Sequence, residues 1–208
     1  MKKKLLNQNR MFPFTRSFLR PFFVVGLMVV FAALFFACQK NKGNTLLKIG
    51  LPSEPKTLNI WLASDANSRK ILNQIYQPLY RRDPITLEII PWLAKEDPVF
   101  DEKELSYTVK LREAKWSDGS EFTSEDVLFT KNLFFDFKIP RYYSKWKIIK
   151  EIKALDKSTV IFYLKKPSAI FLSRVLTAPM VSKKEWELIA ANAMETEKPL
   201  RSIQDHIV

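Results

Sequence analysis

Residues 105–137 read LSYTVKLREAKWSDGSEFTSEDVLFTKNLFFDF, and this stretch decides the fold. Apolar and polar residues alternate strictly from Leu105 to Arg112, which predicts a strand with one buried face. Residues 117–120 predict a tight turn, because Asp bonds its own backbone and Gly accepts positive φ. Thr123 then begins a helix, with Asp126 as the acidic partner of a capping box. The helix is apolar around much of its circumference, so we expect it to pack on more than one side.

The same stretch resembles a family pattern. Leu111-Arg112, then Trp-Ser-Asp-Gly at 116–119, then Thr-x-x-Asp-Val at 123–127 follow the order found in the family 5 extracellular solute-binding proteins. These are the periplasmic dipeptide- and oligopeptide-binding components of ABC importers. The alternative is a generic strand–turn–helix with a Trp in the core. Even within the family these residues look structural, because they build a lobe and need not contact ligand.

Shorter segments continue the resemblance in family order from about Thr45 to Glu187. They are GLPSEPKTLN at 50–59, QIYQPLY at 74–80, PWLA at 91–94 and APMVSKKE at 178–185. The resemblance implies an α/β fold, a mixed-sheet lobe of a type II periplasmic-binding-protein-like fold. Full-length members are much longer and hold the ligand between two lobes. We therefore expect an incomplete fold that corresponds to the amino-terminal part of such a protein.

The first 45 residues read as an export and anchoring segment. Residues 1–21 carry basic residues and no acidic one, and residues 22–37 are an uninterrupted apolar run that ends directly before Cys38. A basic region, an apolar region and a small residue at the cut site are typical of a secretory signal. Ala37-Cys38 also resembles a bacterial lipobox, in which the cysteine receives diacylglycerol. We predict a lipoprotein signal peptide at 1–37, lipidation of Cys38 and a polar tether at 38–45; an uncleaved membrane anchor is the alternative.

The remaining chain, 46–193, is predicted to form the lobe. Periodicity and turn residues predict these elements: a strand at 46–51, a helix at 65–80, a strand at 86–90, an aromatic and basic loop at 138–147, a hairpin of 148–155 with 159–165, a short helix at 169–176, and a helix at 183–193 capped by Ser182. Residues 194–208 lose periodicity and are predicted to be an irregular tail.

Composition argues against several functions. Half of the net charge of +12 lies before Cys38, and the other basic residues are scattered, which favours a solvated mixed-charge surface over nucleic-acid binding. Cys38 and His206 are the only cysteine and histidine, so no disulfide, ordinary zinc site or nucleophile–histidine pair can form within the chain. Four glycines form no phosphate-binding loop. We expect no enzyme, no metal and no cofactor.

The resemblance implies a function. The chain would be the substrate-binding component, in truncated form, of an ABC-type peptide importer, exported and membrane-anchored as a lipoprotein on the periplasmic side or the cell surface. Its partners would be a peptide or similar small solute, the permease subunits, and the membrane through the lipid. In the family the first strand and its following loop border the ligand cleft, which makes Ser53 and Glu54 candidate ligand-binding residues; an ordinary surface loop is the alternative. The rival functions are a surface or structural lipoprotein that reuses the lobe without transport, and an exported enzyme.

Overall fold

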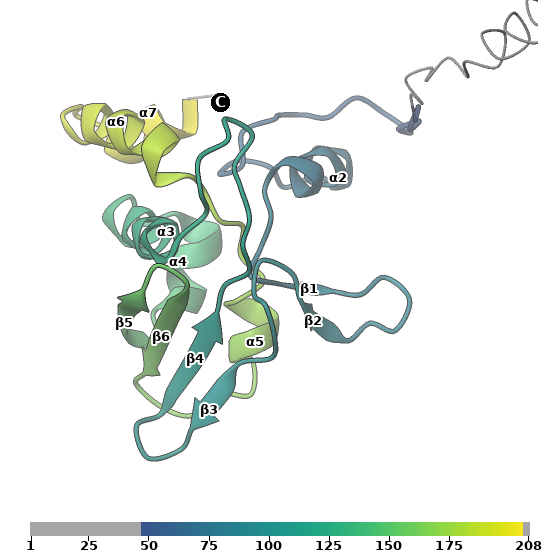
Figure 1. Ribbon diagram of the computed structural model, residues 1–208. Helices are drawn as coiled ribbons and strands as arrows, with labels where there is room; N and C mark the ends of the chain where they lie inside the picture. The colour runs from purple at the N-terminus through teal and green to yellow at the C-terminus, as the bar shows by residue number, and fades with distance from the viewer. Residues whose placement is uncertain (1–46, 206–208) are drawn as a thin grey trace, which may run out of the picture. The chain divides into compact units, whose positions relative to one another are not determined.

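The computed structural model describes residues 47–205, with side chains to residue 203 (Figure 1). The chain divides into two compact units, residues 1–50 and 51–208. Only residues 47–50 of the first unit are described, and they form neither helix nor strand. The predictions for the signal peptide, for Cys38 and for most of the tether lie outside the described residues. All elements below belong to the second unit.

The second unit combines two antiparallel sheets with several helices. One sheet has four strands in the order β3-β4-β6-β5, and the other pairs β1 with β2. The elements, in chain order, are α2 (Ala66–Ile75), β1 (Tyr80–Arg82), β2 (Ile89–Pro91), β3 (Val99–Asp101), β4 (Ser106–Lys110), α3 (Ser124–Asp136), α4 (Pro140–Trp146), β5 (Ile149–Asp156), β6 (Thr159–Leu164), α5 (Phe171–Arg174), α6 (Lys183–Met194) and α7 (Pro199–Asp205). Figure 1 shows α3 and α4 beside β5 and β6, with the β1–β2 hairpin projecting away from the larger sheet.

The structure confirms the strand, turn and helix predicted from residues 105–137. The strand is β4, which pairs with both β3 and β6. Gly119 in the following turn has a φ of 86°, the conformation that glycine tolerates and other residues resist. Helix α3 begins after Thr123 and contacts α4, α6, β5 and β6, so it is packed on more than one side as expected.

Asp126 joins the start of α3 to the start of α6. One carboxylate oxygen, Oδ2, accepts hydrogen bonds from the backbone N–H of Thr123 at 2.8 Å and from the Trp116 indole at 3.4 Å. The other, Oδ1, accepts from the backbone N–H of Lys183 at 2.8 Å. A carboxylate at a helix N-terminus satisfies backbone donors that have no partner within the helix. The turn and cap residues of this stretch are therefore structural, as the sequence indicated.

The core lies between one face of the four-stranded sheet and the helices. Val160, Phe162 and Leu164 alternate inward along β6, and the intervening residues are only partly buried. Trp61 packs edge-on against Phe134 of α3 at 5.9 Å between ring centroids and against Trp186 of α6 at 5.2 Å. Burying a large apolar side chain contributes about 1.5–3 kcal/mol, so these aromatic rings hold α3 and α6 to the segment before α2.

Two predictions about strands are wrong. Residues 47–51 form no strand, and Leu47 and Ile49 are exposed. Alternation yields a strand only where a neighbour takes the backbone hydrogen bonds, and this segment pairs with none of the described strands. The expected mixed sheet is also wrong, because every pairing among the described strands is antiparallel. Two residues join β5 to β6, and so short a connection permits only an antiparallel pair.

Three further boundaries differ from the prediction. The helix expected at 65–80 ends at Ile75, since Pro78 cannot continue it, and Tyr80 opens β1. The loop expected at 138–147 is α4, which begins at Pro140, a residue favoured in the first turn of a helix. The irregular tail expected at 194–208 contains α7, whose Ile203 is fully buried. Tertiary packing supplies the stabilisation that the weak periodicity of these segments did not reveal.

Candidate functional site: a basic cavity between three helices

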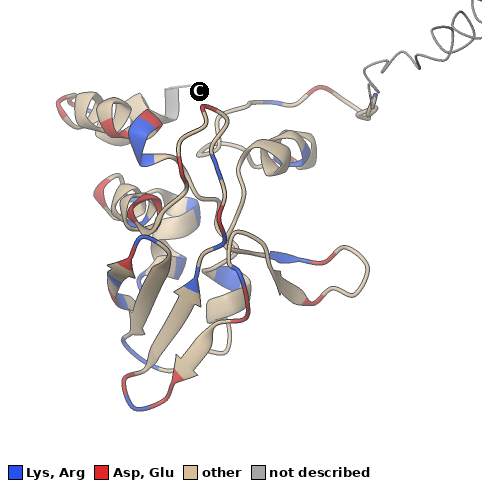
Figure 2. Cartoon of the chain, in the orientation of Figure 1, with Lys and Arg blue, Asp and Glu red and all other residues tan. Residues whose placement is uncertain are grey.

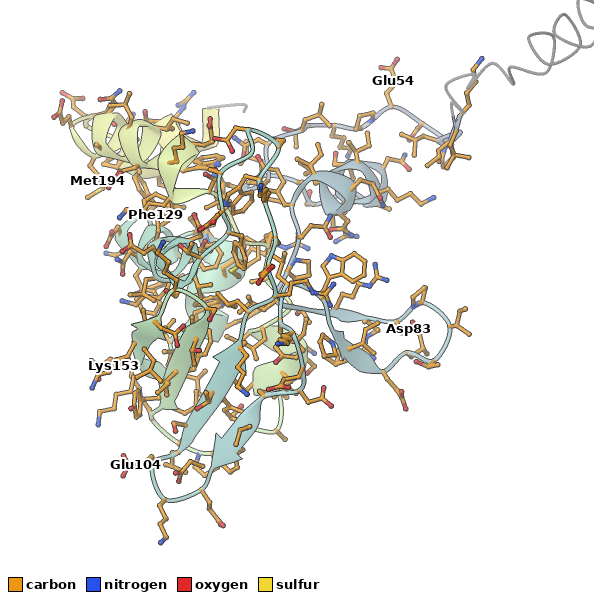
Figure 3. The ribbon with its side chains drawn as sticks, in the orientation of Figure 1. Glu54, Asp83, Glu104, Phe129, Lys153 and Met194 are labelled. Carbon is orange, nitrogen blue, oxygen red and sulfur yellow. The ribbon has the colours of Figure 1, made fainter. Side chains whose placement is uncertain are left out.

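The two predicted ligand-binding residues lie in the exposed loop that precedes α2. Asn67 of α2 donates from its side-chain amide to the backbone oxygen of Ser53 at 3.0 Å and to its hydroxyl at 2.6 Å. Glu54 is exposed and points away from the rest of the second unit (Figure 3). Neither residue lines any of four hollows on the described residues. Their role in ligand binding therefore stays a prediction.

A cavity of about 170 Å³ opens elsewhere, between α2, α4 and α5. Its lining residues come from these helices and from the segments before α2 and after α5: Ile60, Ala63, Arg69, Leu72, Asn73, Arg141, Tyr142, Lys145, Arg174, Thr177, Ala178 and Pro179. A second hollow of about 460 Å³ shares Asn73, Thr177 and Pro179 with it and continues toward the β1–β2 hairpin. The two together form a groove along one side of α2.

The cavity is lined by basic residues without acidic ones. Arg69 comes from α2, Arg141 and Lys145 from α4, and Arg174 from α5. None of these four forms a salt bridge within the described residues. The adjoining hollow adds Arg81 and Arg82 and likewise has no acidic residue in its lining. The lining of the groove therefore carries positive charge, and Asp83, outside the lining, interacts electrostatically with Arg81.

The helices that carry these cations are fixed by buried aromatic residues. In α4, Tyr142 stacks on Phe134 with 4.6 Å between ring centroids, and Trp146 meets the same ring edge-on at 5.0 Å. In α5, Phe171 is fully buried and stacks on Tyr107 of β4. Arg141 and Lys145 are four residues apart, which places them on one face of α4. The backbone under the cations is thus held by the core.

A hydrogen bond positions Arg141, and burial shifts the pKa values of Lys145 and Tyr142. Arg141 donates from Nη1 to the backbone oxygen of Ala63 at 2.8 Å, which ties α4 to the segment before α2. Partial burial lowers the pKa of Lys145, and the nearby Arg141 and Arg174 lower it further. Burial also raises the pKa of Tyr142, so its phenol stays neutral at physiological pH. The depressed pKa of Lys145 thus reflects first its partial burial and then the two cations beside it.

Two other hollows on the described residues lack this one-sided charge. A hollow of about 560 Å³ beside the turn mixes Arg112, Lys115 and Lys157 with Glu113 and Glu121. Figure 2 shows the same interspersed pattern over much of the second unit. No group of three or more Asp, Glu, His or Cys residues among those described is placed to hold a metal ion. Across residues 47–205, no helix has the length and apolar character needed to cross a membrane.

The sequence alone did not reveal the cavity. Its four cations lie on three separate helices and form no continuous motif, so in the sequence they look like scattered surface charges. The one available signal was the spacing of Arg141 and Lys145, which places both on one helix face. The loop predicted at 138–147 conceals this signal, because residues four apart share a face only in a helix.

The family model described as "Bacterial extracellular solute-binding proteins, family 5 Middle" matches residues 88–201. The chain therefore belongs to the family 5 bacterial extracellular solute-binding proteins, which confirms the resemblance seen in the sequence.

Individual relatives agree with the family. The chain is 30% identical over 131 residues to a putative ABC transporter peptide-binding protein of Brucella ovis, covering 60% of this chain and 25% of that protein. Among solved structures, it is similar to the binding protein AgaA of A. tumefaciens R10 in complex with agropinic acid, with a TM-score of 0.60, 26% identity, and 67% and 28% of the two chains covered. It is also similar to the periplasmic binding protein DppA of Helicobacter pylori in complex with the peptide STSA, with a TM-score of 0.55, 28% identity, and 67% and 31% covered. The chain thus spans about a quarter to a third of the length of these relatives.

Proposed function

We propose that the chain is part of the substrate-binding component of an ABC-type importer, where it helps to capture peptides or similar small solutes for a membrane permease. The match of the family model to residues 88–201 carries this proposal. Support also comes from the Brucella ovis relative, which is described as a putative peptide-binding protein of an ABC transporter. The function is capture and release, and no covalent step is assigned to the chain.

The solute would contact the surface of the second unit. The loop that contains Ser53 and Glu54 and the groove along α2 are the two places proposed for this contact. The groove is hollowed and one-sided in charge, whereas the loop is exposed. Polar contacts in such a site can pass through water, which accommodates varied side chains while holding the ligand backbone.

We further propose that the chain is exported and anchored as a lipoprotein. Residues 1–37 would be the signal peptide, Cys38 the acylated residue, residues 38–45 the tether, and the lobe would follow from residue 46. The apolar run that ends directly before the only cysteine supports this order. An anchored surface lipoprotein that reuses the lobe without transport is the rival proposal, and it shares the same anchor.

Uptake and binding together test the proposal. Cells that lack this reading frame should take up radiolabelled di- to pentapeptides more slowly, and the gene in trans should restore uptake. Isothermal titration of the full chain with the same peptides should give binding much weaker than a dissociation constant of about 1 µM, which corresponds to −8.2 kcal/mol, because the chain spans only a quarter to a third of the length of its relatives. Unchanged uptake together with no saturable binding would favour the surface lipoprotein.

A matched pair of variants tests the loop. Ser53→Ala combined with Glu54→Gln should weaken peptide binding about tenfold if the loop borders the site. Glu104→Gln is the control, since Glu104 is an exposed acid in the turn between β3 and β4, far from Glu54 in Figure 3. Equal affinities for the two variants would remove Ser53 and Glu54 from the site.

A further inference from the structure

We propose that the basic cavity between α2, α4 and α5 binds a carboxylate group of the captured solute. This inference rests on the proposed function and adds a chemical class of solute to it. Three observations carry it: the cavity cations form no salt bridge, the cavity has the size of a small acid, and the core holds the backbone of α4 and α5 in place.

The charge of the cavity differs from that of the surface around it. Four lysines elsewhere in the described residues have acidic partners, among them Lys110 with Glu96 at 2.9 Å and Lys183 with Glu125 at 2.7 Å. Arg69, Arg141, Lys145 and Arg174 have none. Asp65, the acid nearest to Arg69 along the chain, accepts a hydrogen bond from the backbone N–H of Ser68 at 2.9 Å as the cap of α2 and does not line the cavity. Like charges gathered without a counter-charge repel one another, and a bound anion relieves that repulsion.

The size of the cavity suits an acid group rather than a whole peptide. Pockets that enclose drug-sized ligands measure about 300–1,000 Å³. A volume of about 170 Å³ holds a carboxylate with a short carbon chain. The adjoining hollow of about 460 Å³ provides room for the rest of the solute. Its lining includes Arg81, whose guanidinium lies 3.3 Å from the centre of the Trp92 ring outside the lining.

The cavity side chains match the chemistry of a carboxylate. Arginine presents several N–H donors in a planar fork that a carboxylate accepts in pairs, and lysine adds a mobile charge. The Asn73 side chain has no protein hydrogen bond within the described residues, so its amide N–H groups are available to an anion. Because α4 and α5 are anchored by buried aromatic rings, the backbone that carries the donors is held in place before the ligand arrives.

The test compares a carboxylate with a neutral molecule of the same shape. The full chain is titrated with succinate and with succinamide, at pH 7 and low salt. We expect saturable succinate binding with a dissociation constant below about 1 mM, weaker binding in 0.5 M NaCl, and no succinamide binding. Succinamide that binds as tightly as succinate, or no saturation with succinate, overturns the proposal. Inorganic phosphate that binds at least tenfold more tightly than succinate also overturns the assignment to a carboxylate.

Variants locate the binding. Lys145→Gln and Arg174→Gln should each weaken succinate binding about tenfold or more, because each loses a charged donor. Lys150→Gln is the control, since Lys150 is an exposed cation on β5 outside the cavity. Lys145 and Arg174 are exposed, so the substitutions should leave the fold intact, and thermal melts check this. Arg69→Gln replaces any variant that does not fold. Cavity variants that fold and bind succinate as the control does would overturn the proposal.

Two further comparisons distinguish failure of the carboxylate site from failure of the proposed capture function. Alanine tripeptide is compared with its carboxamide form in the titration described above. Peptides that bind with equal affinity in both forms, and equally to Lys145→Gln, leave the capture function standing and overturn the carboxylate site. If succinate binding is lost in Lys145→Gln, the carboxylate site stands. If cells that lack this reading frame nevertheless take up peptides at the normal rate, the proposed capture function is overturned.

Discussion

The Asp126 carboxylate accepts a hydrogen bond from the backbone N–H of Lys183 at 2.8 Å, across 57 residues of sequence. Asp126 lies near the start of α3, and Lys183 is the first residue of α6. The same carboxylate caps α3 through Thr123 and receives the Trp116 indole. One buried acid therefore fixes the entry of two helices and the turn that precedes the first.

Asp126→Ala should destabilise the protein by about 3 kcal/mol, because it leaves buried backbone donors without a charged acceptor. The free energy of unfolding from urea titration measures this. Asp136→Ala is the control, since Asp136 is an exposed acid at the end of the same helix and should change stability by less than about 0.5 kcal/mol. Equal stabilities of the two variants would show that the Asp126 network is dispensable.

Asp118 should make stability depend on acid pH. Hydrogen bonds from Lys184 and Ser120 hold the pKa of Asp118 well below its usual value of 3.8. A carboxylate whose pKa is lowered by folding contributes stability that is full above its unfolded pKa and is lost as the pH falls through its folded pKa. The wild type should therefore lose more thermal stability than Asp118→Asn between about pH 5 and pH 2. Lys184→Met should retain part of this pH dependence, because Ser120 remains; identical pH profiles for the wild type and Asp118→Asn would contradict the assignment.

Gly119→Val should cost about 1–3 kcal/mol, because a β-branched residue is strained at a φ of 86°. A Cβ atom at this position would meet no atom within 4 Å, so the loss comes from the backbone conformation. Gly50→Val is the matched control, because that glycine has equal space and no positive φ. Thermal melts of both variants decide the matter: equal shifts would show that the turn does not require glycine.

Ile203→Ala should destabilise the protein by about 2–5 kcal/mol, because Ile203 of α7 is fully buried. Leu188→Ala, on the exposed side of α6, should cost less than about 0.5 kcal/mol. Urea titration of both variants compares them directly. An unchanged midpoint for Ile203→Ala would mean that α7 is not part of the core.

Cys38→Ala should prevent acylation and leave an uncleaved or mislocalised precursor. Mass spectrometry of the mature wild-type protein should find an acylated Cys38 at its N-terminus, because the cysteine directly follows the apolar run. An intact Met1 or a cut at another residue would contradict lipidation.

Local patterns in the sequence determined the central part of the fold. The alternation along β4, the turn at Gly119, the capping box of α3, the β5–β6 hairpin and the Ser182 cap of α6 are all decided by near neighbours in the chain. Such features were predictable because period, capping and turn chemistry act within a few residues. The ordered motif at 111–127 also led to the family, which the comparison confirmed.

Tertiary structure decided the features that depend on distant partners. Residues 47–51 have strand-like alternation but no strand to pair with, whereas α7 lacks a clear period and is held by the burial of Ile203. The basic cavity belongs to the same group, since Arg69, Arg141, Lys145 and Arg174 meet only because the core holds α2, α4 and α5 around one space. Sequence specifies the charge of each side chain; the packing of buried aromatic rings brings those charges together without an acid between them.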